Sequence, residues 1–282
     1  MPLEFEKQKP QPLMLGDKAH YTLSSYDPVS IVVDVARTTD DDVNFAIDTM
    51  LEQVGATRED LNDPAFLAEH FEDVKSADEL YAAARDELEQ VNAQYAESQK
   101  VGLAVAELTK RLQQAIPTML LARYLQGVRM NFEQQLAAEG MTVEQFMARS
   151  GASRTDIEEM VGAQARQVAE QEAALDAYAR EKKLTVDEDE FSHLLGIPAA
   201  GIEEVIKQAR AAGQYEQLKD AALHAKAAQS VVAECSCTYR HETEEQAKER
   251  VARARRLRAE YEQAFAEAEK EAGEPDSGFE LV

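Results

Sequence analysis

The feature that most constrains the fold is a stretch of about forty residues, from Ser76 to Pro117, with the spacing of one long helix. Ser76 and Glu79 have the spacing of a capping box, and Pro117 is expected to end or kink the helix. At ~1.5 Å per residue, such a helix reaches about 60 Å, longer than a compact domain is wide. Its apolar residues step by three or four, with a phase slip near Ser98: Leu80, Ala84, Leu88, Val91, Tyr95, Val101, Val105, Leu108, Leu112 and Ile116.

Capping and stop signals predict further helices on both sides of this stretch. Thr38 or Thr39 caps the first, with Asp40, Asp41 and Asp42 in its first turn, and Gly55 ends it. The other predicted helices cover residues 62–71, 118–139, 142–147, 153–179, 184–195, 198–211, 215–234 and 242–272.

One short run has the character of a strand. Residues 29–35 are rich in β-branched side chains, and residues 20–23 are the expected strand partner. The predicted fold is therefore mostly α: an elongated multi-helix domain with long helices and two helical arms, plus a small β pair near the N-terminus. The expected domains are an N-terminal segment over 1–60, a helical domain over 61–238 and a charged tail over 239–282, with disorder after 273.

Composition excludes several classes of partner. The formal net charge is -24 at pH 7, which argues against DNA because a duplex binder needs a basic surface to displace counterions. No apolar stretch approaches the ~20 residues that cross a bilayer, and the N-terminus lacks the pattern of a signal peptide. Cys235 and Cys237 are too close together to staple a fold, so we interpret them as thiols in a reducing compartment. The expected location is the cytoplasm.

Catalytic and cofactor motifs are absent from the sequence. The five histidines (20, 70, 193, 224 and 241) are scattered without metal-ligand spacing, and the glycines fall singly at helix ends. The sequence therefore predicts no enzyme, no metal and no cofactor.

Several segments resemble one bacterial family, the trigger factors. Residues 112–121 resemble the point where a long linker helix meets the first arm of that chaperone, and Gly140 to Phe146 follows at family-like spacing. Residues 163–179 and 184–190 resemble its arm helix and the acidic turn after it. With the entry segments at 63–71 and 76–88, the resemblance covers roughly residues 63–234. It implies an ATP-independent holdase that binds unfolded or nascent polypeptides in an apolar cradle between helical arms.

The chain also departs from that family. The ribosome-docking signature, Gly-Phe-Arg-x-Gly-Lys, is absent, which puts ribosome binding in doubt. The prolyl-isomerase domain that should precede Asp63 is absent too, so isomerase activity is not expected. Residues 9–17 resemble a remnant of the end of the docking domain, and residues 39–53 the helix that precedes the isomerase domain.

Apolar residues outside the main helical seams are the candidate client-binding site. Met119 and Met130 lie about three turns apart, on the side opposite Leu121 and Leu125. Methionine is flexible and suits surfaces that accept varied partners. The predicted site comprises Met119, Leu120, Tyr124, Met130, Phe146, Met147 and Met160. The alternative is that both faces simply pack between neighbouring helices.

The basic run between Lys248 and Arg258 has two interpretations. It could contact RNA or an acidic partner, or it could be a solvated helix paired with its own glutamates, as in Glu244–Lys248, and the second is favoured. Function likewise keeps an alternative to the holdase: a helical scaffold or assembly adaptor with one dedicated protein partner. The sequence leaves a homodimer open.

Overall fold

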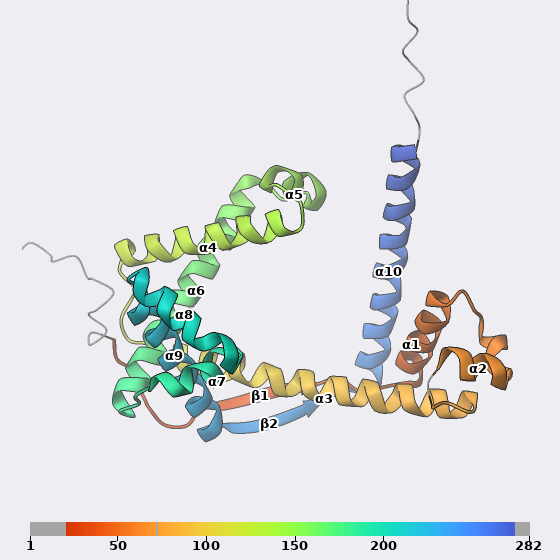
Figure 1. Ribbon diagram of the computed structural model, residues 1–282, viewed down its shortest axis with the longest axis horizontal. Helices are drawn as coiled ribbons and strands as arrows, with labels where there is room; N and C mark the ends of the chain where they lie inside the picture. Colours follow the sequence, from red (N-terminus) through yellow and green to blue (C-terminus); the bar gives the residue numbers. More distant parts are fainter. Residues whose placement is uncertain (1–20, 72, 274–282) are drawn as a thin grey trace, which may run out of the picture. The chain divides into compact units, whose positions relative to one another are not determined.

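The structure is a computed structural model that describes residues 21–71 and 73–273, with side chains described through residue 260 and at residue 263. It confirms a mostly helical fold with a small β pair (Figure 1). The expectations for residues 1–20, including the family-like segment at 9–17, and for residues 274–282 lie outside the described part. The elements in chain order are β1 (Ser30–Val35), α1 (Asp40–Gln53), α2 (Pro64–His70), α3 (Ala77–Thr109), α4 (Thr118–Ala138), α5 (Val143–Ser150), α6 (Arg154–Glu181), α7 (Phe191–Leu195), α8 (Ala199–Ala211), α9 (Tyr215–Glu234), β2 (Ser236–His241) and α10 (Glu244–Gly273), with 3-10 turns at Arg58–Asn62 and Glu188–Glu190.

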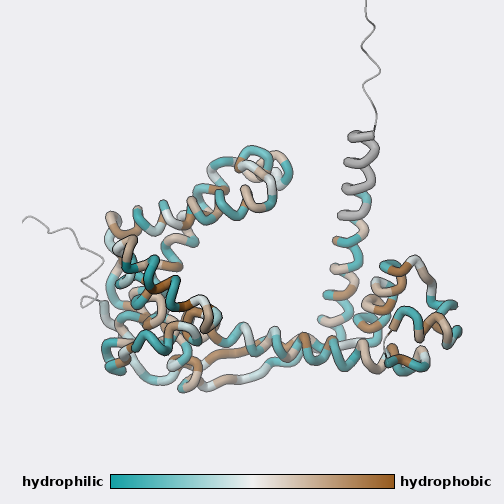
Figure 2. Tube along the Cα trace, in the orientation of Figure 1, coloured by the Kyte–Doolittle hydropathy of each residue, from teal (hydrophilic) through white to brown (hydrophobic). Residues whose placement is uncertain are grey.

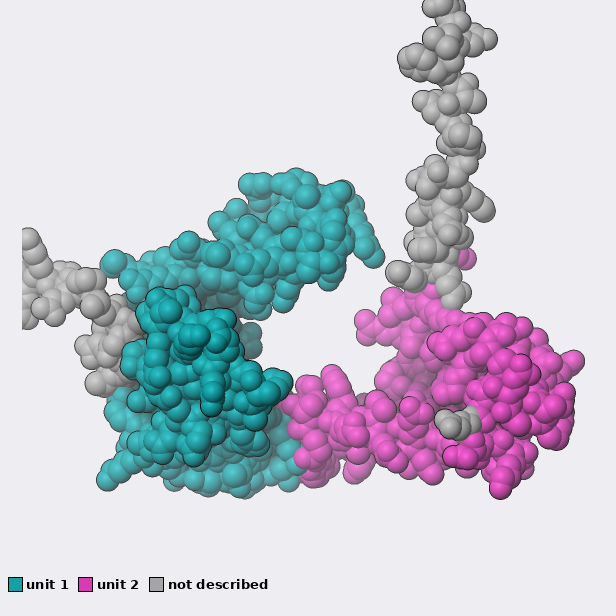
Figure 3. All heavy atoms as spheres, in the orientation of Figure 1, with its two compact units in different colours: residues 1–31, 100–237 teal, residues 32–99, 238–282 magenta. Residues whose placement is uncertain are grey.

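The described chain divides into two compact units (Figure 3). Unit 1 holds residues 21–31 and 100–237, and unit 2 holds residues 32–99 and 238–273. Each unit therefore combines segments that are distant in sequence, whereas the domains expected from the sequence, 1–60, 61–238 and 239–282, are consecutive. In the part of the chain that is described, no helix is both long and apolar enough to cross a membrane.

The β pair joins two segments that lie far apart in the sequence, β1 and β2. The amide of Ser236 donates to the carbonyl of Val29 at 2.8 Å, and the amide of Glu242 donates to that of Val35 at 3.0 Å. Both bonds advance in the same direction, so β1 and β2 are parallel. In this register Arg240 lies beside Asp34, and its Nη2 is 2.7 Å from the carboxylate.

The predicted strand partner at residues 20–23 was therefore wrong. Leu23 instead forms an antiparallel bridge with Leu112, just after α3. The real partner, β2, is a run of Ser, Cys, Thr, Tyr, Arg and His that is almost entirely exposed. It lacks the apolar alternation that marks a strand in a sequence.

The long helix α3 is shorter than predicted, because it ends at Thr109 rather than near Pro117. The amide of Gln113 donates to the carbonyl of Thr22 at 3.0 Å, and the amide of Ser24 donates to that of Arg111 at 2.8 Å. These bonds to the N-terminal segment replace the helical bonds of the last predicted turn. At ~1.5 Å per residue, the 33 residues of α3 span about 50 Å.

The middle of α3 also departs from its predicted apolar seam. Leu80 and Ala84 are buried, but Val91, Tyr95 and Val101 are 52%, 63% and 43% exposed. Periodicity identified the apolar stripe correctly and could not tell where its covering elements stop.

Unit 2 has its core where α1, α2 and the first half of α3 meet. The side chain of Thr39 accepts from the amide of Asp42, and the Asp42 carboxylate accepts from the amide of Thr39, so the predicted cap of α1 is confirmed as a capping box. The core consists of Val43, Ile47, Leu51, Leu61, Leu67, Leu80 and Ala84. Gly55 follows the end of helix α1 in the left-handed conformation, with φ +69°.

Unit 1 is built around α6. Its second half is buried on nearly all sides, from Ala173 to Ala179, and α9 packs against α6. Phe191 is fully buried in a smaller cluster with Val186, Ile206 and Ala222. The predicted helix over 184–195 was partly wrong: residues 184–187 are not helical, and Asp187 caps a 3-10 turn that leads into α7.

Candidate functional site

The most distinct feature of unit 1 is a helical hairpin, formed by α4 and the first half of α6 with α5 at its tip (Figure 1). Near the base, the Tyr124 hydroxyl on α4 donates to the Glu172 carboxylate on α6 at 2.5 Å. Near the tip, Phe132 lines a pocket together with Ile157. Residue numbers rise on one helix as they fall on the other, so the two helices are antiparallel.

Small side chains on α6 allow this close packing. Val161, Ala165 and Ala169 are buried and follow one another at four-residue steps, and Glu172 continues the same face. Because Glu172 contacts α4, this face points toward α4. The facing residues of α4 between Leu121 and Phe132 are only half-buried, so the seam is shallow. Figure 2 shows how closely hydrophobic and hydrophilic residues are interspersed along both helices.

A groove of about 590 Å³ runs along one side of this seam, and we call it the arm groove. Leu121, Ala122 and Leu125 line it from α4, and Gly162 and Ala163 line it from α6. Polar residues complete the lining: Thr118, Glu159, Arg166, Gln167 and Glu170. The lining therefore combines small and apolar residues with flanking polar groups.

A second, smaller pocket of about 190 Å³ lies toward the tip, where α4, α5 and α6 meet. Its apolar lining is Phe132, Val143, Ile157 and Val161. Its charged residues are of both signs: Arg129, Glu133, Glu144, Arg154 and Glu158. The hairpin therefore has hollows over much of its length.

Three of the seven predicted client-binding residues are exposed, and two of them, Met119 and Met160, lie beside the arm groove. Met119, Met130 and Met160 are 75%, 50% and 44% exposed. Met119 precedes Ala122 by one helical turn, and Met160 precedes Ala163 by one turn, so each lies beside a residue of the groove lining. Packing within the described chain does not account for these three side chains.

The other four residues have neighbours of their own. Leu120 and Tyr124 are half-buried, and each lies two positions from Ala122, or about 200° around α4, on the far side from the groove. Phe146 packs edge-on against Phe132, with ring centroids 5.5 Å apart, and Met147 is half-buried beside it on α5. The structure thus separates the predicted set into an exposed group and a packed group.

Burial and hydrogen bonding fix Tyr124 in the fold. Its burial, together with the hydrogen bond to Glu172, raises the pKa of the phenol far above its ordinary value. This hydroxyl therefore stays protonated and keeps donating to Glu172.

The small residues of the groove were not predicted from the sequence. Ala122, Gly162 and Ala163 have no large apolar side chain, so a search for apolar stripes passes over them. The signal that could have found them is the row of small residues on α6, which indicates close approach of another helix.

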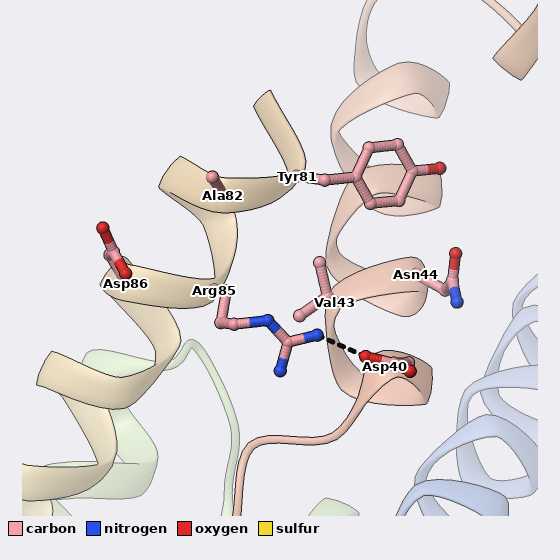
Figure 4. Close-up of a pocket in the computed structure, with 7 residues that line it drawn as sticks. All are labelled: Asp40, Val43, Asn44, Tyr81, Ala82, Arg85 and Asp86. Carbon is pink, nitrogen blue, oxygen red and sulfur yellow. Dashed lines mark hydrogen bonds and ion pairs between the residues drawn. The ribbon is translucent and has the colours of Figure 1, made fainter. Parts of the chain in front are cut away.

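Unit 2 has a pocket of its own, of about 440 Å³, between α1 and α3 (Figure 4). In that view the Arg85 guanidinium points toward Asp40, with which it forms an ion pair. Val43, Tyr81 and Ala82 line it with apolar groups, and Asp40 and Asp86 add carboxylates. Among the described residues, no group of three or more His, Cys, Asp or Glu could hold a metal ion.

The basic run of α10 pairs differently from its favoured interpretation. Lys248 does pair with Glu244, at 2.7 Å, as predicted. However, Arg250 and Arg258 reach α1, where they pair with Asp42 and Glu52. These two arginines therefore hold α10 to α1 rather than pairing within their own helix.

Residues 76–233, more than half of the chain, match the family described as "Bacterial trigger factor protein (TF) C-terminus". The chain belongs to this family. The match begins at the residue before α3 and ends within the last turn of α9, so it includes the hairpin and the arm groove.

Curated members of the family align with part of this chain. Trigger factor 2 of Desulfitobacterium hafniense is 30% identical over 46% of the chain, and the trigger factor of Halalkalibacterium halodurans is 25% identical over 45%. Each alignment covers 30% of the relative, so the chain matches under a third of their length. A crystal structure of a hypothetical Mycoplasma protein, MPN555, covers 78% of the chain and is itself covered to 90%, at 11% identity and a TM-score of 0.38. This last likeness is too low to carry an argument.

Proposed function

We propose that this chain is an ATP-independent chaperone that holds unfolded or nascent polypeptide segments in the arm groove. The observation that carries the proposal is the groove itself, with Met119 and Met160 exposed beside it and Met130 exposed elsewhere on α4. Exposed apolar side chains of this kind mark an interaction surface when nothing in the same chain covers them.

The chemistry of the groove fits weak and varied binding. Methionine adapts its shape to different partners, and the small residues of the α6 wall let an extended backbone approach closely. The flanking residues Glu159, Arg166 and Glu170 carry charges of both signs, so the groove does not demand one charge on the client. The proposed site of action is the cytoplasm.

Membership in the trigger factor C-terminal family supports this proposal at the level of the family. The proposal includes neither isomerase activity nor ribosome binding, since the sequence lacks the features that would suggest them. We propose no enzymatic step for the chain.

The test is aggregation suppression. Two unrelated, chemically denatured proteins are diluted into buffer with and without the chain, without ATP, and light scattering is followed. We expect suppression of both at near-stoichiometric ratios, and a clear loss of it in the triple variant Met119→Gln, Met130→Gln and Met160→Gln.

The matched control removes exposed apolar area elsewhere. Val54 and Leu257 are also exposed, and both belong to unit 2, so Val54→Gln with Leu257→Gln should leave suppression intact. Equal loss of suppression in both variants would show that clients bind nonspecifically to exposed apolar side chains anywhere on the chain. If the parent chain suppresses no aggregation, the holdase proposal is wrong and the single-partner adaptor is favoured.

A further inference from the structure

Charge, more than apolar burial, holds α10 to α1. Within the part of α10 whose side chains are described, the buried residues are Ala247 and Val251, and both are small. The hydrogen bonds and ion pairs described between α10 and α1 come from arginines. Such a junction buries little apolar area, so its stability depends on ion pairs that salt and competitors can weaken.

Arg250 makes the densest set of these contacts. Its Nη1 is 2.7 Å from one oxygen of Asp42, and its Nη2 is 3.2 Å from the other. Its Nε lies 3.1 Å from both oxygens of Glu242, and Nη2 also donates to the carbonyl of Arg37 at 3.0 Å. The guanidinium therefore joins the start of α10 to the start of α1.

Arg255 and Arg258 continue the contact along α1. Arg255 donates to the carbonyl of Asp41 at 3.4 Å. Arg258 donates to the Thr49 hydroxyl at 2.8 Å and pairs with Glu52, and its guanidinium lies 5.5 Å from the centre of the Phe45 ring. This last geometry is a cation–π contact.

These contacts define a second face of α1, which we call the acidic face. Asp42, Phe45, Thr49 and Glu52 are three or four residues apart and so share one side of the helix. The buried residues Val43, Ile47 and Leu51 lie on another side, in the core of unit 2. The acidic face is thus free of core packing and consists of carboxylates around one aromatic ring.

We propose that α10 is a displaceable lid on the acidic face, and that a basic amphipathic helix of a partner protein binds there in its place. The chemistry that holds α10, arginines over carboxylates and a phenylalanine, would recognise such a helix. A partner with larger apolar side chains than Ala247 and Val251 would gain more by burial than α10 does.

The charge of the surrounding segment favours the same partner. Residues 32–99 contain 18 Asp and Glu against 4 Lys and Arg. An acidic segment of this size attracts basic partners and speeds their encounter.

The test uses the full chain and a labelled synthetic peptide of residues 244–260, with binding followed by fluorescence anisotropy. In the variant Arg250→Ala with Arg258→Ala, the lid is weakened, and we expect at least tenfold tighter peptide binding than in the parent chain. Adding Asp42→Asn and Glu52→Gln should abolish the gain. Arg253 and Arg256 are exposed on the same helix, so Arg253→Ala with Arg256→Ala is the matched control and should bind like the parent.

Hydrogen exchange separates lid release from unfolding. In the lid-weakened variant we expect faster exchange in α10 and unchanged exchange in α6, which belongs to unit 1. Faster α10 exchange without tighter peptide binding would contradict the proposal that a basic helix binds the acidic face. An α10 that stays protected in this variant, and in the parent chain at 1 M salt, where the Debye length is about 3 Å, would overturn the lid.

Discussion

The phenol of Tyr124 on α4 donates to the carboxylate of Glu172 on α6, with 2.5 Å between the two oxygens. Both side chains are half-buried at the base of the hairpin. The bond therefore fixes the two helices where the hairpin joins the body of unit 1, and it gives Tyr124 a structural role.

Replacement of Tyr124 by Phe should destabilise the hairpin and spare client binding. The change leaves the half-buried Glu172 without this donor, at a cost of about 1–3 kcal/mol. Hydrogen exchange of α4 amides should accelerate accordingly, while aggregation suppression at low temperature stays near that of the parent chain. A loss of suppression in a chain with unchanged exchange would instead assign Tyr124 to the binding surface.

Two alanine substitutions on α6 should separate stability from binding. Ala169 is buried in the seam, so Ala169→Leu should overpack it and cost about 1–3 kcal/mol, again measured by exchange of α4 and α6. Ala163 is exposed in the lining of the arm groove, so Ala163→Leu should leave exchange unchanged and narrow the groove. Weaker aggregation suppression is then expected for Ala163→Leu, and unchanged suppression would place the clients elsewhere.

The contact between α1 and α10 should weaken in acid. Burial raises the pKa of the Asp42 carboxyl, but hydrogen bonds from Arg250 and Thr39 lower it by a larger amount. The folded-state pKa therefore lies below the ordinary value. A carboxyl with a lowered folded pKa stabilises the fold above its unfolded pKa of about 3.9, and this stabilisation is lost as the pH falls through the folded pKa. After correction for the intrinsic effect of pH on exchange, the protection of α10 amides should therefore decrease once the pH is lower than about 4.

The variant Asp42→Asn tests the origin of this pH dependence. It should show lower α10 protection at pH 7 and a smaller further decrease in acid. If the parent and the variant decline in parallel, other carboxyls control the contact.

Local signals predicted the helices well, and they failed where distant segments decide the structure. The caps at Thr39, Thr142 and Ser153 and the end of α9 at Glu234 follow from nearby residues, and all are confirmed. The end of α3 depends on residues 22–24, about ninety positions away, and the pairing of β1 with β2 depends on a strand about two hundred positions away. No periodicity within a short window contains that information.

The candidate site was predictable only in part for a similar reason. Helical spacing placed Met119 and Met130 opposite the seam of α4, and both are exposed. The same spacing could not reveal that Tyr124 has a partner on α6, since Glu172 is 48 residues further along the chain. Nor could it reveal the groove wall, because Gly162 and Ala163 contribute by their small size.

Arg111 provides a test of the N-terminal segment. Its Nη1 donates to the carbonyls of Ser25, at 3.3 Å, and Asp27, and its Nη2 donates to that of Pro28 at 3.3 Å. One planar guanidinium thereby holds three carbonyls, which the single ammonium of lysine cannot reproduce. We expect Arg111→Lys and Arg111→Ala to be similarly destabilising, by about 1–3 kcal/mol, because alanine removes the donor and the single ammonium of lysine cannot serve all three carbonyls at once.

The neighbouring Lys110 pairs with Glu107 on the surface, so Lys110→Ala should change stability by less than about 0.5 kcal/mol. Exchange of the amides of Ser24 and Gln113 measures both effects, and a lysine variant as protected as the parent would show that charge alone holds the segment.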